Sequence, residues 1–289
     1  MKNKFFNDTC IVAVSFKSQT KILKLIKKLD KSISVIIIEN SKDFQLKQKV
    51  ERKYKNVKVI VPKLNKGIAY AINLAVKNTK KKYIMYLASD IDIKNSQIIQ
   101  LLKKANNIEK FGAITAKIQD QDYKDLIINP KKTNGLTEVW FNTGCIMLMK
   151  KNLMKKVNYF DDKYFLYFEE SDYYKRCIDK NLPIFMYDKV TIKHEGGAAI
   201  EENFRSDYQK VRNWHYCWSK FYYYKKHYGY LKGLSKTTPN LVRAIKSIIH
   251  GIFTFNFDKA LTHYVEIEGL FCSYLNLKSF YRIKKEKLL

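Results

Sequence analysis

Cysteine is scarce in this sequence of 289 residues, and its five copies are scattered and odd in number. They stand at Cys10, Cys145, Cys177, Cys217 and Cys272, and no C-x-x-C pair occurs. A disulfide-stapled domain or a structural zinc site requires paired spacing. The sequence therefore excludes both classes, and we expect the protein to work in a reducing compartment.

Long apolar runs are also missing. No stretch reaches the roughly 18 uncharged apolar residues that a membrane-spanning helix requires. The N-terminal sequence MKNKFFNDTCIVAVSF carries basic residues, but a strand-like run begins before any apolar segment long enough for a signal peptide. We expect a cytoplasmic protein that is either soluble or peripheral on the inner face of the membrane.

Arginine is rare although the chain is strongly basic. The formal net charge is +28, yet only six of the 55 basic residues are arginine. Proteins that read nucleic-acid sequence lean on bidentate arginine, and no helix-turn-helix, zinc-finger or aromatic RNP pattern occurs. Nucleic acid is therefore not an expected partner. The charge favours anionic lipid headgroups and nucleotide diphosphates, or it reflects a lysine-rich composition without function.

Glycine-rich phosphate loops are absent as well. The ten glycines form neither G-x-G-x-x-G nor G-x-x-x-x-G-K-[ST], so dinucleotide-binding and P-loop functions lose their main support. Residues 10–120 instead alternate short apolar runs with helical patterns, which is typical of βα units that build a mostly parallel sheet. The strands that we expect span residues 11–16, 34–39, 57–61, 83–88 and 112–118.

The fourth of these strands ends in two carboxylates. The run YIMYLASDIDI, residues 83–93, suits a central strand covered on both faces. Asp90 and Asp92 follow it, at the end of a strand where open α/β sheets bind their ligands. Such hard oxygen ligands can hold a divalent cation against a phosphate. The alternative role is a helix N-cap, but Asn95 and Ser96 already offer caps for the next helix.

Two other strand ends carry polar residues. The second strand ends in Glu39-Asn40-Ser41, and the third leads through Asn65-Lys66-Gly67 into a helix over residues 68–76. The N-terminus of that helix should face the same crevice and favour an anion. Further along, Trp140 to Gly144 precede an expected strand over 145–149, and a glycine there indicates a bulge or a close approach of ligand to backbone.

A second acidic cluster, Glu169, Glu170 and Asp172, opens a helix among aromatic residues. Acidic residues in a first turn favour the helix dipole, which alone would explain one or two of them. Aromatic walls also raise carboxylate pKa values and stack on ring-shaped ligands, which favours a site. His194 follows an expected strand over 191–193, and although a lone histidine is usually structural, this one is a candidate ligand.

The region from residue 201 to 289 is helical, aromatic and basic. One aromatic stretch interleaves lysines with Trp214, Trp218, Phe221, Tyr222, Tyr223 and Tyr224. A following apolar stripe consists of Leu241, Ile245, Ile248, Ile249 and Ile252. Two interpretations stay open here, a helical subdomain packed on the catalytic core and an interfacial membrane surface.

In this order and spacing, the pieces resemble the family 2 inverting glycosyltransferases of GT-A fold, particularly their rhamnosyltransferase-like branch, over about residues 10 to 200. The matching positions are residues 11–15, Glu39-Asn40-Ser41, Asn65-x-Gly67 with Ala71 and Asn73, Ser89-Asp90, Asn142-Thr143-Gly144, Phe165 to Asp172 with Arg176, and His194. The resemblance implies a Rossmann-like GT-A catalytic domain over residues 1–200 and a role in surface-polysaccharide biosynthesis. Residues 201–289 are then the helical C-terminal extension of this domain.

The resemblance also implies site roles. It indicates a UDP- or dTDP-linked sugar donor, a glycan or lipid-linked acceptor, Mn²⁺ or Mg²⁺ as cofactor, and Glu170 as general base. The implied donor contacts are Ser15, Glu39, Asn65, Gly67 and Ser89. The implied metal ligands are Asp90, Asp92 and His194. The implied acceptor contacts are Trp140, Thr143, Gly144, Glu169 and Asp172.

Transfer of a sugar from a diphosphate places elementary chemical demands on such a site. Breaking a sugar–diphosphate bond requires neutralisation of the leaving group's charge, which a divalent cation on Asp90 would supply. A carboxylate that takes the acceptor's proton is worth about 10² to 10⁴ in rate. Attack opposite the leaving group would invert the anomeric centre. A glycoside hydrolase is disfavoured because its two carboxylates require neither a metal nor a nucleotide crevice.

Two other functions stay open. Ala88 stands at the first position of the family's D-x-D motif, and Glu170 stands where aspartate is usual. These departures motivate a catalytically silent homologue that binds nucleotide sugars or partners. A nucleic-acid-binding protein is motivated only by the charge.

Overall fold

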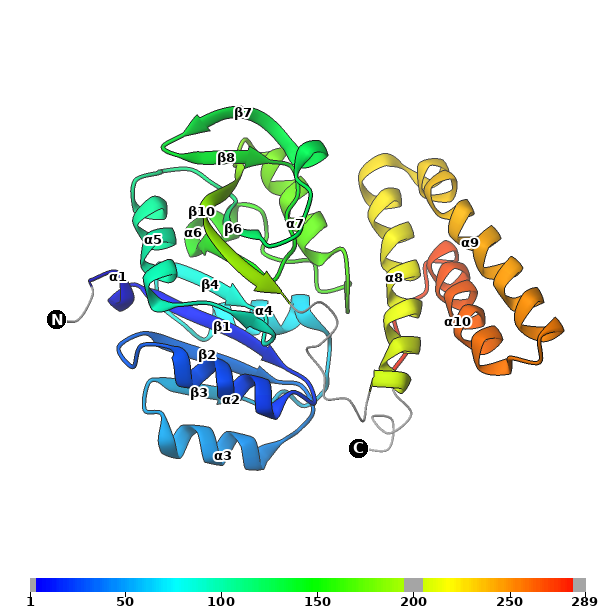
Figure 1. Ribbon diagram of the computed structural model, residues 1–289, viewed down its shortest axis with the longest axis horizontal. Coiled ribbons are helices and arrows are strands. Elements are labelled where there is room, and N and C mark those ends of the chain that lie inside the picture. Colours follow the sequence, from blue (N-terminus) through cyan, green and yellow to red (C-terminus); the bar gives the residue numbers. More distant parts are fainter. Residues whose placement is uncertain (1–3, 195–204, 283–289) are drawn as a thin grey trace. The chain divides into compact units, whose positions relative to one another are not determined.

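The computed structural model describes residues 4–194 and 205–282, and the chain divides into two compact units (Figure 1). The sheet unit comprises Met1–Asp161 and Glu170–Glu201. The helical unit comprises Asp162–Glu169 and Glu202–Leu289. The chain therefore enters the helical unit for one short segment, returns to the sheet unit, and enters the helical unit again.

In the described residues, ten strands form one sheet in the order β3-β2-β1-β4-β9-β6-β10-β8-β7, with β5 paired to β10. Their bounds are β1 Thr9–Ser15, β2 Ser34–Glu39, β3 Val57–Ile60, β4 Tyr83–Leu87, β5 Ile91–Asp92, β6 Ala113–Ile118, β7 Ile127–Thr133, β8 Leu136–Val139, β9 Ile146–Lys150 and β10 Ile184–His194. β1 runs parallel to β2 and β4, and β2 runs parallel to β3. The predicted α/β fold with a mostly parallel central sheet is confirmed.

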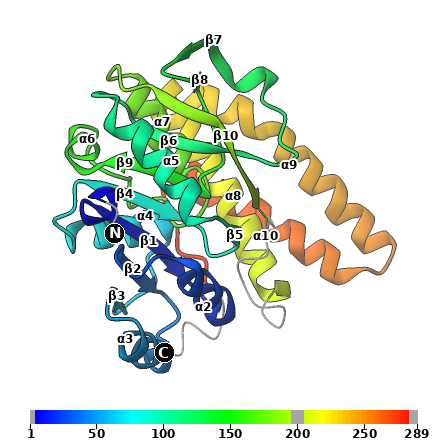
Figure 2. The same ribbon diagram turned by 60° about the vertical axis from the view of Figure 1, so that its left-hand side comes forward.

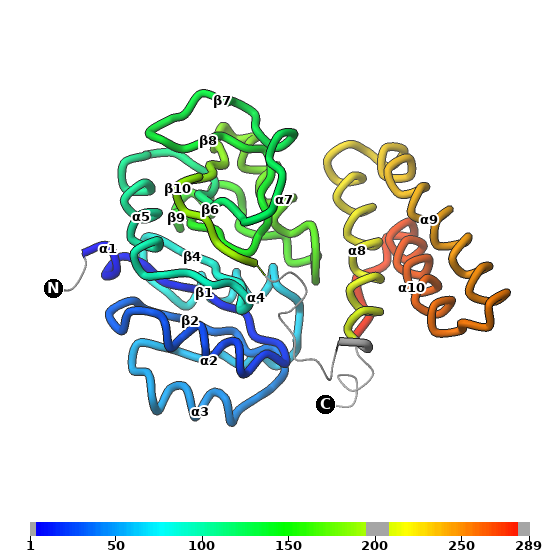
Figure 3. Tube along the Cα trace, in the orientation of Figure 1, coloured from blue at the N-terminus to red at the C-terminus, as the bar shows by residue number. Residues whose placement is uncertain are grey.

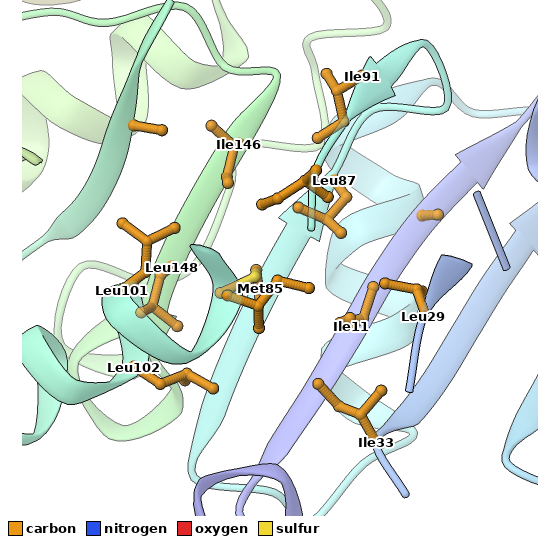
Figure 4. Packing of buried hydrophobic residues seen from close by; sticks show 14 of the residues in the cluster. Ile11, Leu29, Ile33, Met85, Leu87, Ile91, Leu101, Leu102, Ile146 and Leu148 are labelled. Carbon is orange, nitrogen blue, oxygen red and sulfur yellow. The ribbon is translucent and has the colours of Figure 1, made fainter. Parts of the chain in front are cut away.

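Helices cover both faces of the sheet. They are α1 Lys4–Asn7, α2 Gln19–Lys28, α3 Phe44–Lys53, α4 Ile68–Lys77, α5 Asn95–Asn106, α6 Lys151–Lys156 and α7 Glu169–Ile178, with a 3-10 turn η1 Lys124–Leu126. Successive strand residues face opposite sides of a sheet. Ile11 and Met85 pack with Leu101 of α5 in one buried cluster (Figure 4). Their neighbours Val12 and Ile84 are buried as well, which explains why these strands read as continuous apolar runs.

The second half of the sheet departs from the sequence predictions. β9 runs antiparallel between β4 and β6, and β7 with β8 forms an antiparallel hairpin beside β10 that we did not predict. Every residue of β7 is exposed, so its sequence carries no apolar alternation. β10 begins at Ile184, well before the expected strand over 191–193, and its pairing with β6 shifts between Tyr187 and Thr191.

The cap predicted for α5 is also corrected. Lys94 occupies the N-cap position, and its backbone N–H donates to Gln97 Oε1 at 2.8 Å. Asn95 instead fixes the end of α2, because its Nδ2 donates to Lys28 O at 2.9 Å and its Oδ1 accepts from the Asp30 N–H at 3.0 Å. The side chain of Asn95 thus holds α2 against the segment that follows Asp92.

The helical unit contains α8 Arg205–Tyr228, α9 Tyr230–Phe253 and α10 Phe257–Tyr274, which Figures 2 and 3 show side by side. Trp214, Trp218 and Phe221 of α8 are buried, so the aromatic stripe of this helix forms a hydrophobic core and not a membrane-facing surface. Segment 162–169 packs into the same unit, since Ser219 Oγ donates to Leu166 O at 2.9 Å. Within the described residues, every helix is too short or too polar to cross a bilayer.

Candidate active site

Asp90 and His194 lie next to each other although 104 positions separate them in sequence. The two-residue strand β5 pairs antiparallel with the end of β10, and this register sets His194 opposite Ile91. His194 Nε2 lies 3.5 Å from Asp90 Oδ1. Burial opposes the charged form of Asp90, but His194, the backbone N–H of Asp90 and the charge of Lys21 together lower the pKa of the carboxyl below its ordinary value. Asp90 is therefore a buried carboxylate that stays ionised.

Asp92 has a different environment. Its side chain is largely exposed and accepts a hydrogen bond from Lys28 Nζ at 2.5 Å, which lowers the pKa of the carboxyl. Asp92 lies opposite Lys193 in the β5–β10 register, so successive residues of the strand turn Asp92 and Ile91 to opposite sides. The structure thus brings Asp90 and His194 together and engages Asp92 in an exposed ion pair.

A cavity of about 240 Å³ adjoins these residues. Ser89, Asp90 and Asp92 line it with Leu25, Ile91 and four lysines, Lys21, Lys24, Lys28 and Lys193. Two carboxylates surrounded by four ammonium groups suit a ligand with several negative charges and a bound cation. We did not predict these lysines as site residues, because Lys21, Lys24 and Lys28 show the pattern of the solvent face of an amphipathic helix, α2, and Lys193 lies within β10.

The donor atoms at Asp90 fit a divalent cation. Asp90 Oδ1 is buried, and it accepts no hydrogen bond of good geometry from the described residues. A carboxylate oxygen with an imidazole beside it is a suitable start for a Mn²⁺ or Mg²⁺ site, in which waters and substrate phosphates commonly complete the shell. Across residues 4–194 and 205–282, three acidic, histidine or cysteine side chains nowhere gather with metal-binding geometry.

Ser15 and Glu39 are register partners at the ends of β1 and β2, so the structure brings these predicted donor contacts together. Both are buried. Desolvation raises the pKa of Glu39, while hydrogen bonds from the hydroxyls of Ser15 and Ser41 oppose that shift. The Ser41 N–H also donates to Glu39 Oε1 at 2.6 Å. Asn40 was not among our predicted site residues, yet its buried Oδ1 has no partner in the described part of the chain.

Asn65 and Gly67 form the entrance to α4. Asn65 Oδ1 accepts a hydrogen bond from the Gly67 N–H at 3.0 Å, and Gly67 has a φ of 92°, which lies in the region that favours glycine. This turn starts the predicted helix at Ile68. Farther along α4, the buried Asn73 donates from Nδ2 to Phe160 O at 2.9 Å and accepts from the Phe160 N–H at 3.1 Å. Asn73 therefore joins α4 to the chain that leads toward α7.

Glu170 lies in the first turn of α7 and packs against Gly144. A Cβ at Gly144 would fall 3.0 Å from the Cβ of Glu170, so a larger residue at this position would force the Glu170 side chain to shift. Desolvation raises the pKa of Glu170, although the backbone N–H groups of Glu170 and Ser171 oppose the shift. Its Oε2 is buried and has no hydrogen-bond partner among the residues described. Glu170 thus combines restricted solvation with a carboxylate oxygen available to a ligand.

Cys145 links the two carboxylate sites. Burial raises the pKa of its thiol to about 12, and the negative charges of Asp90 and Glu170 add to that increase. Its carbonyl accepts a hydrogen bond from the Ala88 N–H at 2.8 Å, which fixes it beside the end of β4. Asp90 and Glu170 therefore both lie within electrostatic range of one buried residue on the sheet unit.

The other acids of the second cluster are placed differently. Asp172 is fully buried, and Arg176 Nε donates to its Oδ2 at 2.8 Å one turn along α7. Glu169 is also buried, and it ends the segment that belongs to the helical unit. Asp172 thus has a structural partner that explains its presence, and the dipole of α7 favours both acids.

The predicted acceptor loop is fixed by Asn142. Its buried Nδ2 donates to Thr115 Oγ1 at 2.7 Å and to Ala116 O at 3.0 Å, and its Oδ1 accepts from the Thr143 N–H at 2.8 Å. Thr143 Oγ1 donates to Gln121 Oε1 at 3.0 Å. Trp140 is half exposed, and its indole N–H donates to Asp125 O at 2.7 Å. The loop therefore presents an aromatic face and a hydroxyl from a rigid base.

Open α/β sheets bind their ligands outside the carboxyl ends of the strands, and here the end of β4 leads to the buried carboxylate of Asp90 and the lysine-lined cavity. The sequence model of Glycosyl transferase family 2 matches residues 10–174. The chain belongs to this family, and the protein is a glycosyltransferase.

Individual relatives are distant. The chain is 19% identical over 230 residues to the low-salt glycan biosynthesis hexosyltransferase Agl10 of Haloferax volcanii, covering 72% of this chain and 74% of that protein. Its fold resembles the mannosyltransferase PcManGT of Pyrobaculum calidifontis, solved in complex with GDP-Man and Mn²⁺, at a TM-score of 0.60, 9% identity and coverage of 93% and 87%. It also resembles S. aureus TarS 1-349 in complex with UDP-GlcNAc, at a TM-score of 0.52 and 14% identity, covering 95% of this chain and 93% of that one.

Proposed function

We propose that the protein is a metal-dependent, inverting glycosyltransferase that moves one sugar from a nucleotide-diphosphate donor to a hydroxyl of a glycan or lipid-linked acceptor. The observation that carries this proposal is the pair of carboxylates of Asp90 and Glu170, whose Oδ1 and Oε2 atoms are buried and accept no hydrogen bond in the described part of the chain. Asp90 stays ionised and suits a cation, whereas Glu170 has a raised pKa and suits a base. Two carboxylates with different proton affinities are what a group transfer of this type requires.

The donor diphosphate would occupy the lysine-lined cavity. Asp90 and His194 would hold the divalent cation, which when bound supplies positive charge to the leaving diphosphate. Lys21, Lys24 and Lys193 contribute further positive charge around the same cavity. The nucleoside would lie toward Ser15, Glu39 and Asn40, the last of which offers a buried carbonyl oxygen to a base or ribose.

Glu170 would accept the proton of the acceptor hydroxyl as that oxygen bonds to the anomeric carbon. The bond from this carbon to the diphosphate oxygen breaks, and the electron pair leaves with the nucleoside diphosphate. Attack opposite the leaving group inverts the anomeric centre. Trp140 and Thr143 would contact the acceptor, since they belong to a rigid loop that ends at Gly144 against Glu170.

The nucleotide and the cell context complete the proposal. UDP- and dTDP-linked sugars are the donors that we propose, as in the rhamnosyltransferase-like branch, with the nucleoside beside the register partners Ser15 and Glu39. The acceptor would be an envelope polysaccharide or its lipid-linked precursor on the cytoplasmic side of the membrane. The relative Agl10 is named as a glycan biosynthesis hexosyltransferase, which supports a role in glycan assembly.

A donor panel tests the proposal. UDP-, dTDP- and GDP-linked sugars are incubated with the protein, Mn²⁺ and a lipid-linked or glycan acceptor, and released nucleotide diphosphate is measured. We expect turnover with one nucleotide class and none with Glu170→Gln. Tight binding of a nucleotide sugar without turnover on any acceptor would instead favour the catalytically silent homologue. Salt-sensitive retention on DNA without nucleotide-sugar binding would overturn both.

A further inference from the structure

The connection between α9 and α10 carries an exposed apolar surface, which we call the apolar tip: Ile249, Ile252, Phe253, Phe255 and Phe257. Phe253 and Phe255 are 80% and 81% exposed, and Phe257 is 65% exposed. They lie at the end of the hairpin that α9 and α10 form (Figure 1). Contiguous exposed apolar residues mark surfaces that bind another molecule.

The turn that presents these phenylalanines is well ordered by hydrogen bonds. The Phe255 N–H donates to Ile252 O at 3.1 Å, and the Asn256 N–H donates to Gly251 O at 2.8 Å. Asn256 Oδ1 then caps α10 by accepting from the Lys259 N–H at 3.0 Å. A Cβ at Gly251 would lie 3.0 Å from the Ala260 nitrogen, so the two helices approach closely at the turn. The rings are thus held outward by a fixed backbone.

Basic side chains flank the apolar tip. An open groove of about 790 Å³ runs along α9 and α10, lined by Thr238, Pro239, Val242, Arg243, Lys246, Ser247, His250 and Lys259. Lys259 Nζ lies 3.4 Å from His250 Nδ1. Glu266 pairs with Arg243 at 2.9 Å, and Asp258 lies in the first turn of α10. Lys246 and Lys259 also line the groove and form no ion pair within the described residues.

We propose that the apolar tip inserts into an anionic phospholipid bilayer while Lys246 and Lys259 contact headgroup phosphates. Apolar rings beside basic side chains are the pattern of an interfacial anchor. A second copy of the chain is a poorer occupant, because a symmetric contact would set Lys246 and Lys259 against the same charges. The net charge of +28 also favours an anionic surface over a neutral one.

This inference deepens the proposed function and rests on it for its setting, but it stands on different residues. α8 is not the anchor, since its tryptophans are buried. The exposed part of the stripe predicted on α9, Ile245, Ile249 and Ile252, leads directly into the apolar tip. Vesicle binding requires neither donor nor acceptor, so its failure and the failure of sugar transfer are distinguishable.

The test is co-sedimentation of the full chain with vesicles of phosphatidylglycerol and phosphatidylcholine, compared with phosphatidylcholine alone. We expect binding only to the anionic vesicles, with release as salt rises. Phe253→Ser and Phe255→Ser should each weaken binding about tenfold, since each removes an exposed ring that the proposed insertion would bury in the bilayer. Lys246→Gln and Lys259→Gln should each weaken it about fivefold. In Phe255→Trp, brominated lipid should quench the added fluorescence relative to the parent.

Phe44→Ser and Lys49→Gln on α3 are matched controls, because both residues are exposed and lie on the sheet unit. They should bind vesicles as the parent does. Equal loss of vesicle binding in the control and tip variants would overturn the proposal. Vesicle binding that requires the lysines but not the phenylalanine rings would also overturn it, because it would indicate contact with a polyanion alone. A concentration-dependent dimer that Phe255→Ser abolishes would assign the apolar tip to a second copy.

Discussion

Gly144 lies directly against Glu170: a Cβ at Gly144 would stand 3.0 Å from the Cβ and 3.1 Å from the Cγ of that side chain. Gly144→Ala must therefore displace the candidate base by a few tenths of an ångström. We expect transfer to fall about tenfold with donor binding intact, because small misplacements of catalytic groups are costly. Steady-state kinetics and calorimetry with the nucleotide check the two halves of this prediction.

The interaction between the two positions offers a sharper control. If Gly144→Ala acts through Glu170, it should cost almost nothing more in a Glu170→Gln background, since neighbouring substitutions are not additive. Full additivity of the two losses would place the effect of Gly144 elsewhere in the loop.

Glu170→Gln should lower transfer at least about 10²-fold while leaving donor binding unchanged. Glu170→Asp should retain partial activity, because the charge remains and only its position changes. Burial raises the pKa of Glu170 above 4.5, and the base acts when ionised, so the rate of the parent should rise with pH through a midpoint above that value. The Gln variant should lack this limb of the pH–rate profile.

Stability separates this effect from misfolding. A carboxyl whose pKa is raised in the folded state binds its proton more tightly there, so ionisation above pH 4.5 disfavours folding. Glu170→Gln should therefore be at least as stable as the parent at neutral pH by thermal unfolding.

If Glu169→Gln abolishes transfer and Glu170→Gln does not, the base has been misassigned.

Asp90→Asn should weaken nucleotide-diphosphate binding in Mn²⁺ at least about tenfold, as expected for a residue that holds the cation. Asp92→Asn should change it less than about threefold, since its exposed pair with Lys28 contributes little. Titration calorimetry with and without chelator compares them. If both variants lost nucleotide binding equally, the metal motif would have been assigned two residues too early. If the parent bound nucleotide and transferred sugar undiminished in chelator, the proposed metal dependence would be wrong.

Asp172→Asn should destabilise the fold by about 3 kcal/mol, because it leaves the Arg176 guanidinium beside a neutral partner in a largely buried site. Asp179→Asn is the matched control, since Asp179 forms an exposed pair with Lys175 near the end of the same helix and should cost less than about 0.5 kcal/mol. Urea unfolding measures both. A stable but inactive Asp172→Asn would mean that Asp172 acts on the acceptor.

The longer strands up to residue 118 could be predicted because most of their apolar residues are buried, whereas the two-residue strand β5 was not predicted. The β7–β8 hairpin could not, since every residue of β7 is exposed and polar positions such as Lys131 and Lys132 carry no periodic signal. Pattern also failed to separate two kinds of apolar stripe. Trp214 on α8 is core, whereas Ile249 on α9 is exposed, and only the partners of each helix decide between them.

The candidate site was predicted in part, for a similar reason. Asp90 and Glu170 stand out because a carboxylate at a strand end or among aromatic residues is unusual. His194 and Asp90 meet through a two-residue strand, which is too short to leave a sequence pattern. Asn40 stood in a polar run that we noted, but its buried, unpartnered oxygen is visible only once β2 is packed.

Segment 162–169 prevents a clean separation of the sheet unit from the helical unit, because it belongs to the helical unit but lies between two parts of the sheet unit in sequence. Phe165 stacks on His215 of α8, with ring centroids 4.5 Å apart, and Tyr164 packs on Tyr222. Truncating the chain near residue 203 would expose the rings of Tyr164 and Phe165, which immediately precede Glu170 in sequence. Such a truncation would therefore not yield an independent catalytic module. A chimaera that carries these helices on another enzyme would also need segment 162–169. A truncated chain would lose membrane binding and catalysis together, so point substitutions are the better way to separate the two functions.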